Sequence, residues 1–255
     1  MSISGGFIGH GSPMNTLERN RFTDAWRALG PKLGRPRAVL VVSAHWYTNA
    51  TLLTAMEQPR TIHDFYGFPD ELFAVQYPAP GAPDVAQLVA DTVKPRWAGL
   101  DIDGWGLDHG TWSVLVHVLP DADIPVVQLS LNALQPIEYH VDIGTRLAPL
   151  LDEGIVVLGS GNVVHNLRRI DWKRADEPFD WNRRFDEAAT EIATERPGDV
   201  LELTQHDDYA LAVPTPDHFL PFVYFAALAA ARGARPEVLV DGYSLGSLSM
   251  TSFTI

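Results

Sequence analysis

The stretch that decides the fold is Arg37–Tyr47, whose sequence reads RAVLVVSAHWY. Five apolar residues, Ala38–Val42, follow one another without alternation and then give way to Ser43, Ala44 and His45. An uninterrupted run of small and β-branched residues is typical of a strand that is buried on both faces of a sheet. Open α/β sheets bind their ligands outside the carboxyl ends of the strands. The sequence therefore predicts that His45 lies just past the end of a strand, at a ligand-binding edge.

Short apolar runs alternate with amphipathic segments along the rest of the chain, which predicts alternating strands and helices. Strands are expected at residues 3–8, 37–43, 51–55, 125–131, 155–158, 237–240 and 247–255, and helices at residues 16–29, 84–93, 113–119, 137–151, 180–195 and 219–232. No internal repeat, low-complexity segment or charged linker divides the chain. We expect one domain over residues 1–255, with a three-layer α/β/α fold. Its central sheet would be mostly parallel or mixed, with helices on both faces and an antiparallel C-terminal edge.

The composition excludes several classes of protein. A formal net charge of −13 argues against a nucleic-acid or anionic-membrane partner, since either would require a basic surface. No apolar run approaches the about 18 residues of a membrane-spanning helix, and the N-terminus MSISGGFIGHG lacks the layout of a signal peptide. These features predict a cytoplasmic protein. They carry no prediction of its oligomeric state.

The chain contains no cysteine, which narrows its chemistry. Disulfides, thiolate nucleophiles, iron–sulfur clusters and cysteine-type zinc sites are all excluded. Any metal must be held by histidine, aspartate or glutamate, and the chain offers nine histidines.

Five of these histidines share a context of glycine, serine, aromatic or proline residues at the end of an apolar element: His10, His45, His109, His165 and His218. Each one alone would be a core residue as readily as a functional one. Imidazole is, however, the commonest metal ligand and the usual general base, and loops at the carboxyl ends of strands converge in space. One shared site explains the five more economically than five separate cores. The sequence therefore predicts a histidine-rich metal site, although it contains no local metal motif such as HExxH.

The other four histidines are expected to have different roles. His117 lies inside a helical apolar run and is predicted to be a hydrogen-bonded core residue. His140 is expected on a helix surface, and His206 lies in a polar run where a solvated role is expected. His63, beside Asp64 in the aromatic and turn-rich segment TIHDFYGFP, is consistent either with a pocket rim or with loop structure.

Six short motifs occur in one order along the chain. They are GHGSPMN (9–15), SAHW (43–46), FYGFP (65–69), GLDHGTWS (106–113), GSGNVVHNL (159–167) and PTPDHFLPF (214–222). Any one of them is weak, but as an ordered set they resemble the class III extradiol ring-cleaving dioxygenases, and within them the 4,5-DOPA dioxygenase branch. The resemblance extends from residue 9 to about residue 222.

This resemblance implies an α/β fold with a mononuclear non-haem iron(II) at one end of the sheet. By similarity, His10, His45 and His218 are the metal ligands. His165 is the catalytic acid/base or a fourth ligand, and His109 lines the pocket and contacts substrate or dioxygen. In the protocatechuate-cleaving branch a glutamate takes the place of His218, so the neutral three-histidine set here would also suit zinc in the purified protein. Asp217 is the alternative source of a carboxylate.

The function implied is cleavage of the ring of a DOPA-like catechol beside its two hydroxyls, with both atoms of O2 incorporated. Trp46, Tyr66 and Trp112 are candidates for the wall around the aromatic ring, or for core packing. Two other functions remain open: a zinc-dependent hydrolase that uses the same histidines, and a non-catalytic binding or scaffold relative. All five histidines stand in their motif contexts, which disfavours the non-catalytic relative.

Overall fold

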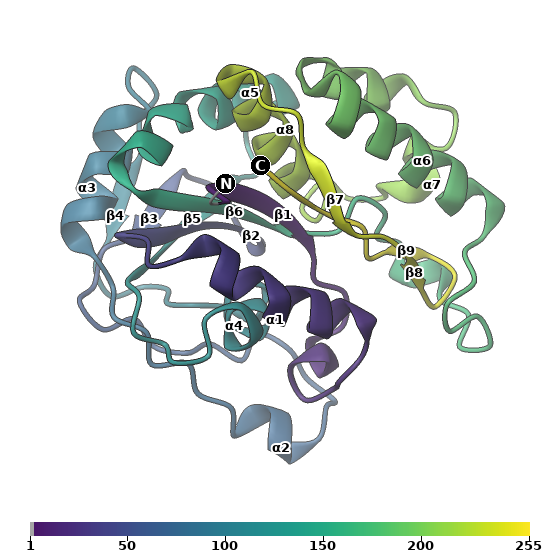
Figure 1. Cartoon of the computed structure of the whole chain (residues 1–255), viewed down its shortest axis with the longest axis horizontal. Coiled ribbons are helices and arrows are strands. Elements are labelled where there is room, and N and C mark those ends of the chain that lie inside the picture. The colour runs from purple at the N-terminus through teal and green to yellow at the C-terminus, as the bar shows by residue number, and fades with distance from the viewer. Residues whose placement is uncertain (1–2) are drawn as a thin grey trace.

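Eight strands form the central sheet of the computed structural model, which describes residues 3–255 (Figure 1). The strand order across the sheet is β4-β3-β5-β2-β6-β1-β10-β7. The strands are β1 (Gly5–Gly9), β2 (Ala38–Thr48), β3 (Leu52–Thr54), β4 (Gly99–Asp101), β5 (Val126–Asn132), β6 (Ile155–Gly161), β7 (Glu237–Val240) and β10 (Ser252–Thr254). A small hairpin of β8 (Tyr243–Ser244) and β9 (Leu248–Ser249) lies beside the sheet.

The centre of the sheet is parallel and its flanks are mixed. Strand β2 pairs in parallel with β5 on one side and with β6 on the other, and β6 pairs in parallel with β1. Strand β3 runs antiparallel to β5, and β10 runs antiparallel to both β1 and β7. The carboxyl ends of β1, β2, β5 and β6 therefore meet at one edge, and the predicted mixed sheet with an antiparallel C-terminal side is confirmed.

Helices cover both faces of this sheet, which confirms the three-layer α/β/α prediction (Figure 1). Along β2, Val39 and Val41 enter one core with side chains of α1 and α4. Leu40 and Val42 enter the opposite core with α3, α5 and α8. The unbroken apolar run at the start of β2 thus serves both faces. The helices are α1 (Arg21–Leu33), α2 (Asp70–Phe73), α3 (Pro83–Thr92), α4 (His109–Val118), α5 (Ile137–Arg146), α6 (Asp180–Glu195), α7 (Tyr209–Ala212) and α8 (Leu220–Arg232), with 3₁₀ turns at Pro13–Thr16, Ala148–Glu153, Leu167–Arg169 and Pro197–Gln205.

The first helix differs from the prediction of residues 16–29. It begins after Asn20, whose side chain accepts hydrogen bonds from the backbone of Phe22 and Thr23, while the Thr23 hydroxyl accepts one from the Asn20 backbone in return. The helix then continues through Gly30. A Cβ atom at Gly30 would lie 2.1 Å from the Val118 carbonyl oxygen, so this glycine allows α1 and α4 to approach closely and does not end the helix.

Two further differences place the functional histidines. Strand β2 does not stop at Ser43 but continues to Thr48, with an irregularity in its pairing with β5 between Val42 and Tyr47, so that His45 lies inside the strand. Helix α4 begins at His109, four residues earlier than predicted, because the Asp108 side chain caps it by accepting from the Thr111 backbone. Within residues 3–255, no helix combines the length and apolar character needed to cross a membrane.

Candidate metal centre

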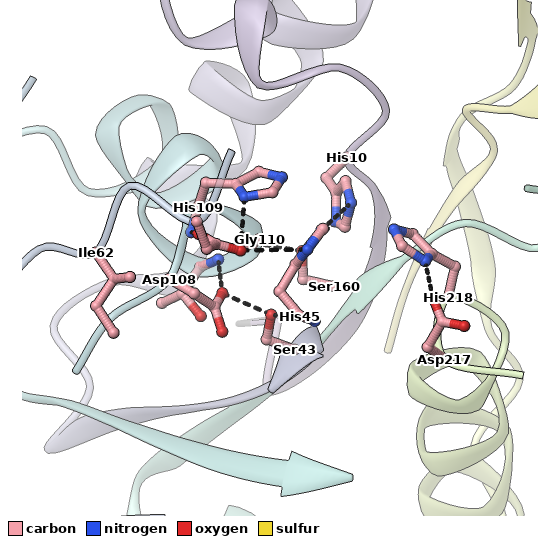
Figure 2. A network of polar contacts seen from close by, with 12 residues as sticks. His10, Ser43, His45, Ile62, Asp108, His109, Gly110, Ser160, Asp217 and His218 are labelled. Atoms are coloured by element: carbon pink, nitrogen blue, oxygen red, sulfur yellow. Dashed lines mark hydrogen bonds and ion pairs between the residues drawn. The ribbon is translucent and has the colours of Figure 1, made fainter. Parts of the chain in front are cut away.

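All five histidines predicted to share a site come together at the carboxyl edge of the parallel strands. His10 follows β1, His45 lies in β2, His109 begins α4, His165 follows β6 and His218 precedes α8. The ring centroids of His10, His45 and His218 are separated pairwise by 4.9–5.4 Å. His109 lies 3.8 Å from His45, and His165 lies 3.5 Å from His218. Figure 2 shows four of these rings, those of His10, His45, His109 and His218, gathered around one region.

Two glycines permit this convergence of backbones. A Cβ atom at Gly110 would lie 2.5 Å from Ser43 Oγ and 2.8 Å from His45 Cδ2. A Cβ atom at Gly161 would lie 2.3 Å from the carbonyl oxygen of His218. The motif glycines therefore allow α4 to approach β2, and the segment before α8 to approach β6.

A chain of hydrogen bonds sets the tautomer of His10. The Ser160 hydroxyl donates to the Gly110 carbonyl oxygen, so it must act as the acceptor in its 2.9 Å contact with His10 Nδ1. His10 consequently carries its proton on Nδ1 and presents a free lone pair at Nε2. That Nε2 lies 3.2 Å from Nε2 of His45.

Carboxylates face the Nδ1 atoms of His45, His109 and His218. Asp64 Oδ2 lies 3.3 Å from Nδ1 of His45 and 2.9 Å from Nδ1 of His109, and Asp217 contacts Nδ1 of His218 (Figure 2 shows the Asp217 contact). A carboxylate only accepts hydrogen bonds, so it favours a proton on the nitrogen that faces it. A ring that carries its proton on Nδ1 keeps its lone pair at Nε2.

This arrangement fits a divalent metal. Histidines that bind metals are held through the other ring nitrogen by a carboxylate, a carbonyl or a similar acceptor, which is the pattern found here. Nε2 of His45 and Nε2 of His10 lie 3.2 Å apart, close enough to share a proton or a cation. Potential ligand atoms of His10, His45 and His109 also lie within 4.8 Å of one another. His109, predicted to line the pocket, thus stands as close to the centre as a ligand would.

The electrostatics of four of these rings favour the neutral form, which is the form that binds a metal. Burial, reinforced by the neighbouring histidines, lowers the pKa of His10 and of His218 well below the ordinary value. Burial lowers the pKa of His45 to about 3 and that of His165 to about 4. For Asp64, burial opposes ionisation, but contacts with His109 and His45 outweigh it and lower the pKa.

A buried polar network behind the rings was not predicted. Asp108 is fully buried, and burial followed by the charge of Asp64 raises its pKa to about 6. It accepts from the Ser43 hydroxyl at 2.7 Å, and Ser43 Oγ accepts from the backbone of His45. Gln128 on β5 also donates to Asp108. This network ties α4 to β2 and β5, and so fixes His109 relative to His45. The motifs SAHW and LDH contain Ser43 and Asp108, but their spacing carries no sign of this contact.

Comparison with known proteins identifies the family. Residues 10–253 match the model of the catalytic LigB subunit of aromatic ring-opening dioxygenase. The chain belongs to this family. The resemblance drawn from the six motifs is thereby confirmed, as is the prediction of a dioxygenase.

Relatives of this LigB-family chain match it over nearly its full length. A protein of Escherichia coli (strain K12) named 4,5-DOPA dioxygenase extradiol is 46% identical, covering 98% of this chain and 93% of the relative. A Beta vulgaris protein of the same name is 33% identical, with coverages of 97% and 94%. The crystal structure of uncharacterized protein JW3007 from Escherichia coli K12 superposes with a TM-score of 0.85 at 40% identity, covering 99% of both chains.

The three predicted wall residues of the LigB-family chain lie in different environments. Trp46 is 4% exposed and stacks on Trp105 with ring centroids 5.8 Å apart. Trp112 is fully buried in the core, where its indole nitrogen donates to the Ile62 carbonyl at 2.7 Å. Tyr66 is 92% exposed.

Three histidines outside the site, His117, His140 and His63, lie in different environments. His117 is buried and its Nε2 contacts the Asn15 carbonyl oxygen at 2.8 Å, which confirms the predicted core role. The surface position expected for His140 is wrong: its side chain is buried where α5 packs on α8, with Nδ1 3.1 Å from the Tyr224 hydroxyl. His63 Nε2 lies 2.9 Å from the Val75 carbonyl oxygen and so helps to hold the loop, whereas its neighbour Asp64 faces the metal centre.

Proposed function

We propose that this protein is a metal-dependent extradiol dioxygenase that opens the ring of a DOPA-like catechol with O2. The observation that carries the proposal is the set of histidine imidazoles converging at the carboxyl edge of the sheet in a family of ring-opening dioxygenases. Two relatives that match nearly the whole chain are named 4,5-DOPA dioxygenase extradiol.

The proposed ligands are His10, His45 and His218, with iron(II) as the active metal. When bound, the ion supplies Lewis acidity, which promotes ionisation of the catechol hydroxyls, and the redox chemistry of dioxygen. The three neutral rings bring no charge of their own, and zinc therefore also suits them. Asp64 and Asp217 contact the rings of His45 and His218, and their negative charge compensates part of the charge of the cation.

His165 is proposed as the catalytic base. Its pKa of about 4 keeps the ring unprotonated at neutral pH, so it is ready to accept a proton from a catechol hydroxyl and to return it as the ring opens. Its backbone nitrogen donates to the Ala212 carbonyl at 2.9 Å, which holds the residue in place. His109, beside His45, is placed to contact substrate or dioxygen.

The deciding experiment is oxygen uptake by the intact protein. Protein loaded anaerobically with iron(II) and given L-DOPA or other catechols is expected to consume O2 and to form a yellow semialdehyde product. Hydrolysis of an ester or amide without oxygen uptake on any catechol would establish the zinc hydrolase instead. Catechol binding without turnover of either kind would identify a non-catalytic relative.

A further inference from the structure

One carboxylate in the metal centre, that of Asp64, contacts two histidine rings. Asp64 Oδ2 lies 3.3 Å from Nδ1 of His45 and 2.9 Å from Nδ1 of His109. Its other oxygen, Oδ1, accepts the backbone N–H of His109 at 2.9 Å. The side chain is mostly buried, at 14% exposure. Asp64 therefore connects β2, which carries His45, to α4, which begins at His109, in addition to the connection through Asp108 and Ser43.

The loop that carries Asp64 is anchored on both sides. The Ile62 backbone donates to the Leu107 carbonyl at 2.7 Å, and the Trp112 indole donates to the Ile62 carbonyl. On the other side of Asp64, the ring of Phe65 packs edge-on against His109 with centroids 5.4 Å apart. These contacts hold the carboxylate against the two rings.

We infer that Asp64 is a positioning residue that fixes His45 and His109 together in the Nδ1–H tautomer and so directs both Nε2 lone pairs to the metal centre. The inference rests on the proposed metal site but not on the proposed reaction. Because the ionised carboxylate has no proton to donate, a ring that faced it with a bare Nδ1 would set two lone pairs against each other. A proton on Nδ1 of each ring avoids this repulsion.

Within residues 3–255, no other hydrogen-bond acceptor contacts the Nδ1 atoms of both His45 and His109. His10 is held by Ser160, and His218 is held by Asp217. Loss of the Asp64 charge would therefore affect His45 and His109 while leaving the tautomers of His10 and His218 in place.

The variant Asp64→Asn tests the inference because an amide has one acceptor atom and one donor group. Because Oδ1 is needed to accept the His109 backbone N–H, the NH2 group would take the place of Oδ2 and face both Nδ1 atoms, so that these rings would have to move their protons to Nε2. We expect zinc(II) affinity, measured by competition with a chelating dye, to fall about 10- to 100-fold, the usual effect of removing such a partner. Asp70→Asn, an exposed carboxylate at the start of α2, is the matched control and is expected to keep the affinity unchanged.

Imidazole ¹⁵N NMR of the metal-free protein gives the second readout. Wild-type His45 and His109 are both expected to show Nδ1–H, and at least one of them is expected to show Nε2–H in Asp64→Asn. An Nε2–H tautomer at either ring of the wild type would overturn the inference even if the variant failed to fold. Unchanged zinc affinity and unchanged tautomers in folded Asp64→Asn would overturn it as well. Neither readout depends on catechol turnover, so a failure of the dioxygenase proposal would be seen separately.

Discussion

The imidazole of His165 lies parallel to that of His218, with an interplanar angle of 2° and ring centroids 3.5 Å apart. A nitrogen lone pair lies in the plane of its ring, so the lone pairs of two stacked rings run in parallel planes and do not converge on one ion. This relationship favours His165 as the base over His165 as a fourth ligand, provided that His218 binds the metal.

His165→Ala is accordingly expected to keep stoichiometric metal and to lose turnover. General acid–base catalysis contributes about 10²- to 10⁴-fold, and a loss of kcat in that range is expected. Metal content by elemental analysis and oxygen uptake with a catechol measure the two effects separately. Loss of the metal would assign His165 to the ligand set, and retained turnover would remove it from the mechanism.

His218 is proposed as the third metal ligand, and metal content of alanine variants tests this assignment. His218→Ala is expected to lose stoichiometric metal, as are His10→Ala and His45→Ala, whereas His109→Ala is expected to retain it. His109 is nevertheless grouped as tightly with His10 and His45 as a ligand would be. Elemental analysis after dialysis checks the set, with His206→Ala, which lies outside the histidine cluster and accepts the Asp208 backbone N–H, as the control. Loss of the metal in His109→Ala together with its retention in His218→Ala would establish the ligand set His10, His45 and His109.

The parallel strands at the centre of the sheet and the five histidines were predictable because their signals are local. The apolar run Ala38–Val42 needs only its own sequence to identify a strand buried on both faces, and each functional histidine stands in a short motif at the end of an element. The start of α1 was also within reach, since Asn20 followed by Thr23 is a reciprocal cap that the amphipathic pattern alone overlooked.

What the sequence could not predict depends on packing between distant elements. The Asp64 carboxylate faces the metal centre because Ile62 is fixed to Leu107 and Trp112, contacts that are 45 and 50 residues apart along the chain. His140 is buried because Tyr224, 84 residues away, brings a hydroxyl to its ring. Neither contact has a signature in the local spacing of residues.

Gly110→Ala is expected to weaken metal binding without removing any ligand. The new methyl group would lie 2.5 Å from Ser43 Oγ and 2.8 Å from His45 Cδ2, so β2 and α4 would have to separate and the His45 ring would move. Because displacement of a ligand by less than 1 Å is enough to disturb a site of this kind, a loss of zinc(II) affinity of about tenfold or more is expected. Gly198→Ala is the control, since its methyl group would meet no atom closer than 3.7 Å. Equal affinities in the two variants would contradict the close-approach argument.

Alanine substitutions at Tyr66 and Trp112 are expected to have different effects, the first on substrate binding and the second on stability. Trp112 is fully buried and its indole donates a hydrogen bond, so Trp112→Ala should reduce the free energy of unfolding by about 3–5 kcal/mol. Tyr66 is 92% exposed, and Tyr66→Ala should change that free energy by less than about 0.5 kcal/mol. If Tyr66 contacts the catechol, its loss raises KM. Urea unfolding and steady-state kinetics of both variants provide the measurement, and an unchanged KM in Tyr66→Ala would remove this residue from the pocket wall.

His140 gives the folded state a pH dependence that is separate from the metal centre. Burial lowers its pKa to about 4, whereas the unfolded chain has an ordinary value of about 6.5. Above about pH 6.5 the ring is neutral in both states and its contribution is constant. As the pH falls from about 6.5 to about 4, the unfolded state takes up the proton first, so the free energy of unfolding decreases by roughly 3 kcal/mol in total and then levels off.

Substitution at His140 should remove this dependence. In urea unfolding of the metal-free protein, His140→Phe is expected to lose less stability than the wild type between pH 7 and pH 5. Tyr224→Phe is the matched control, because it deletes the same 3.1 Å contact but leaves the titrating ring in place, and its profile should run parallel to that of the wild type. The site histidines titrate in all three proteins and cancel in the comparison. A His140→Phe profile parallel to the wild type would show that His140 does not titrate differently in the folded and unfolded states.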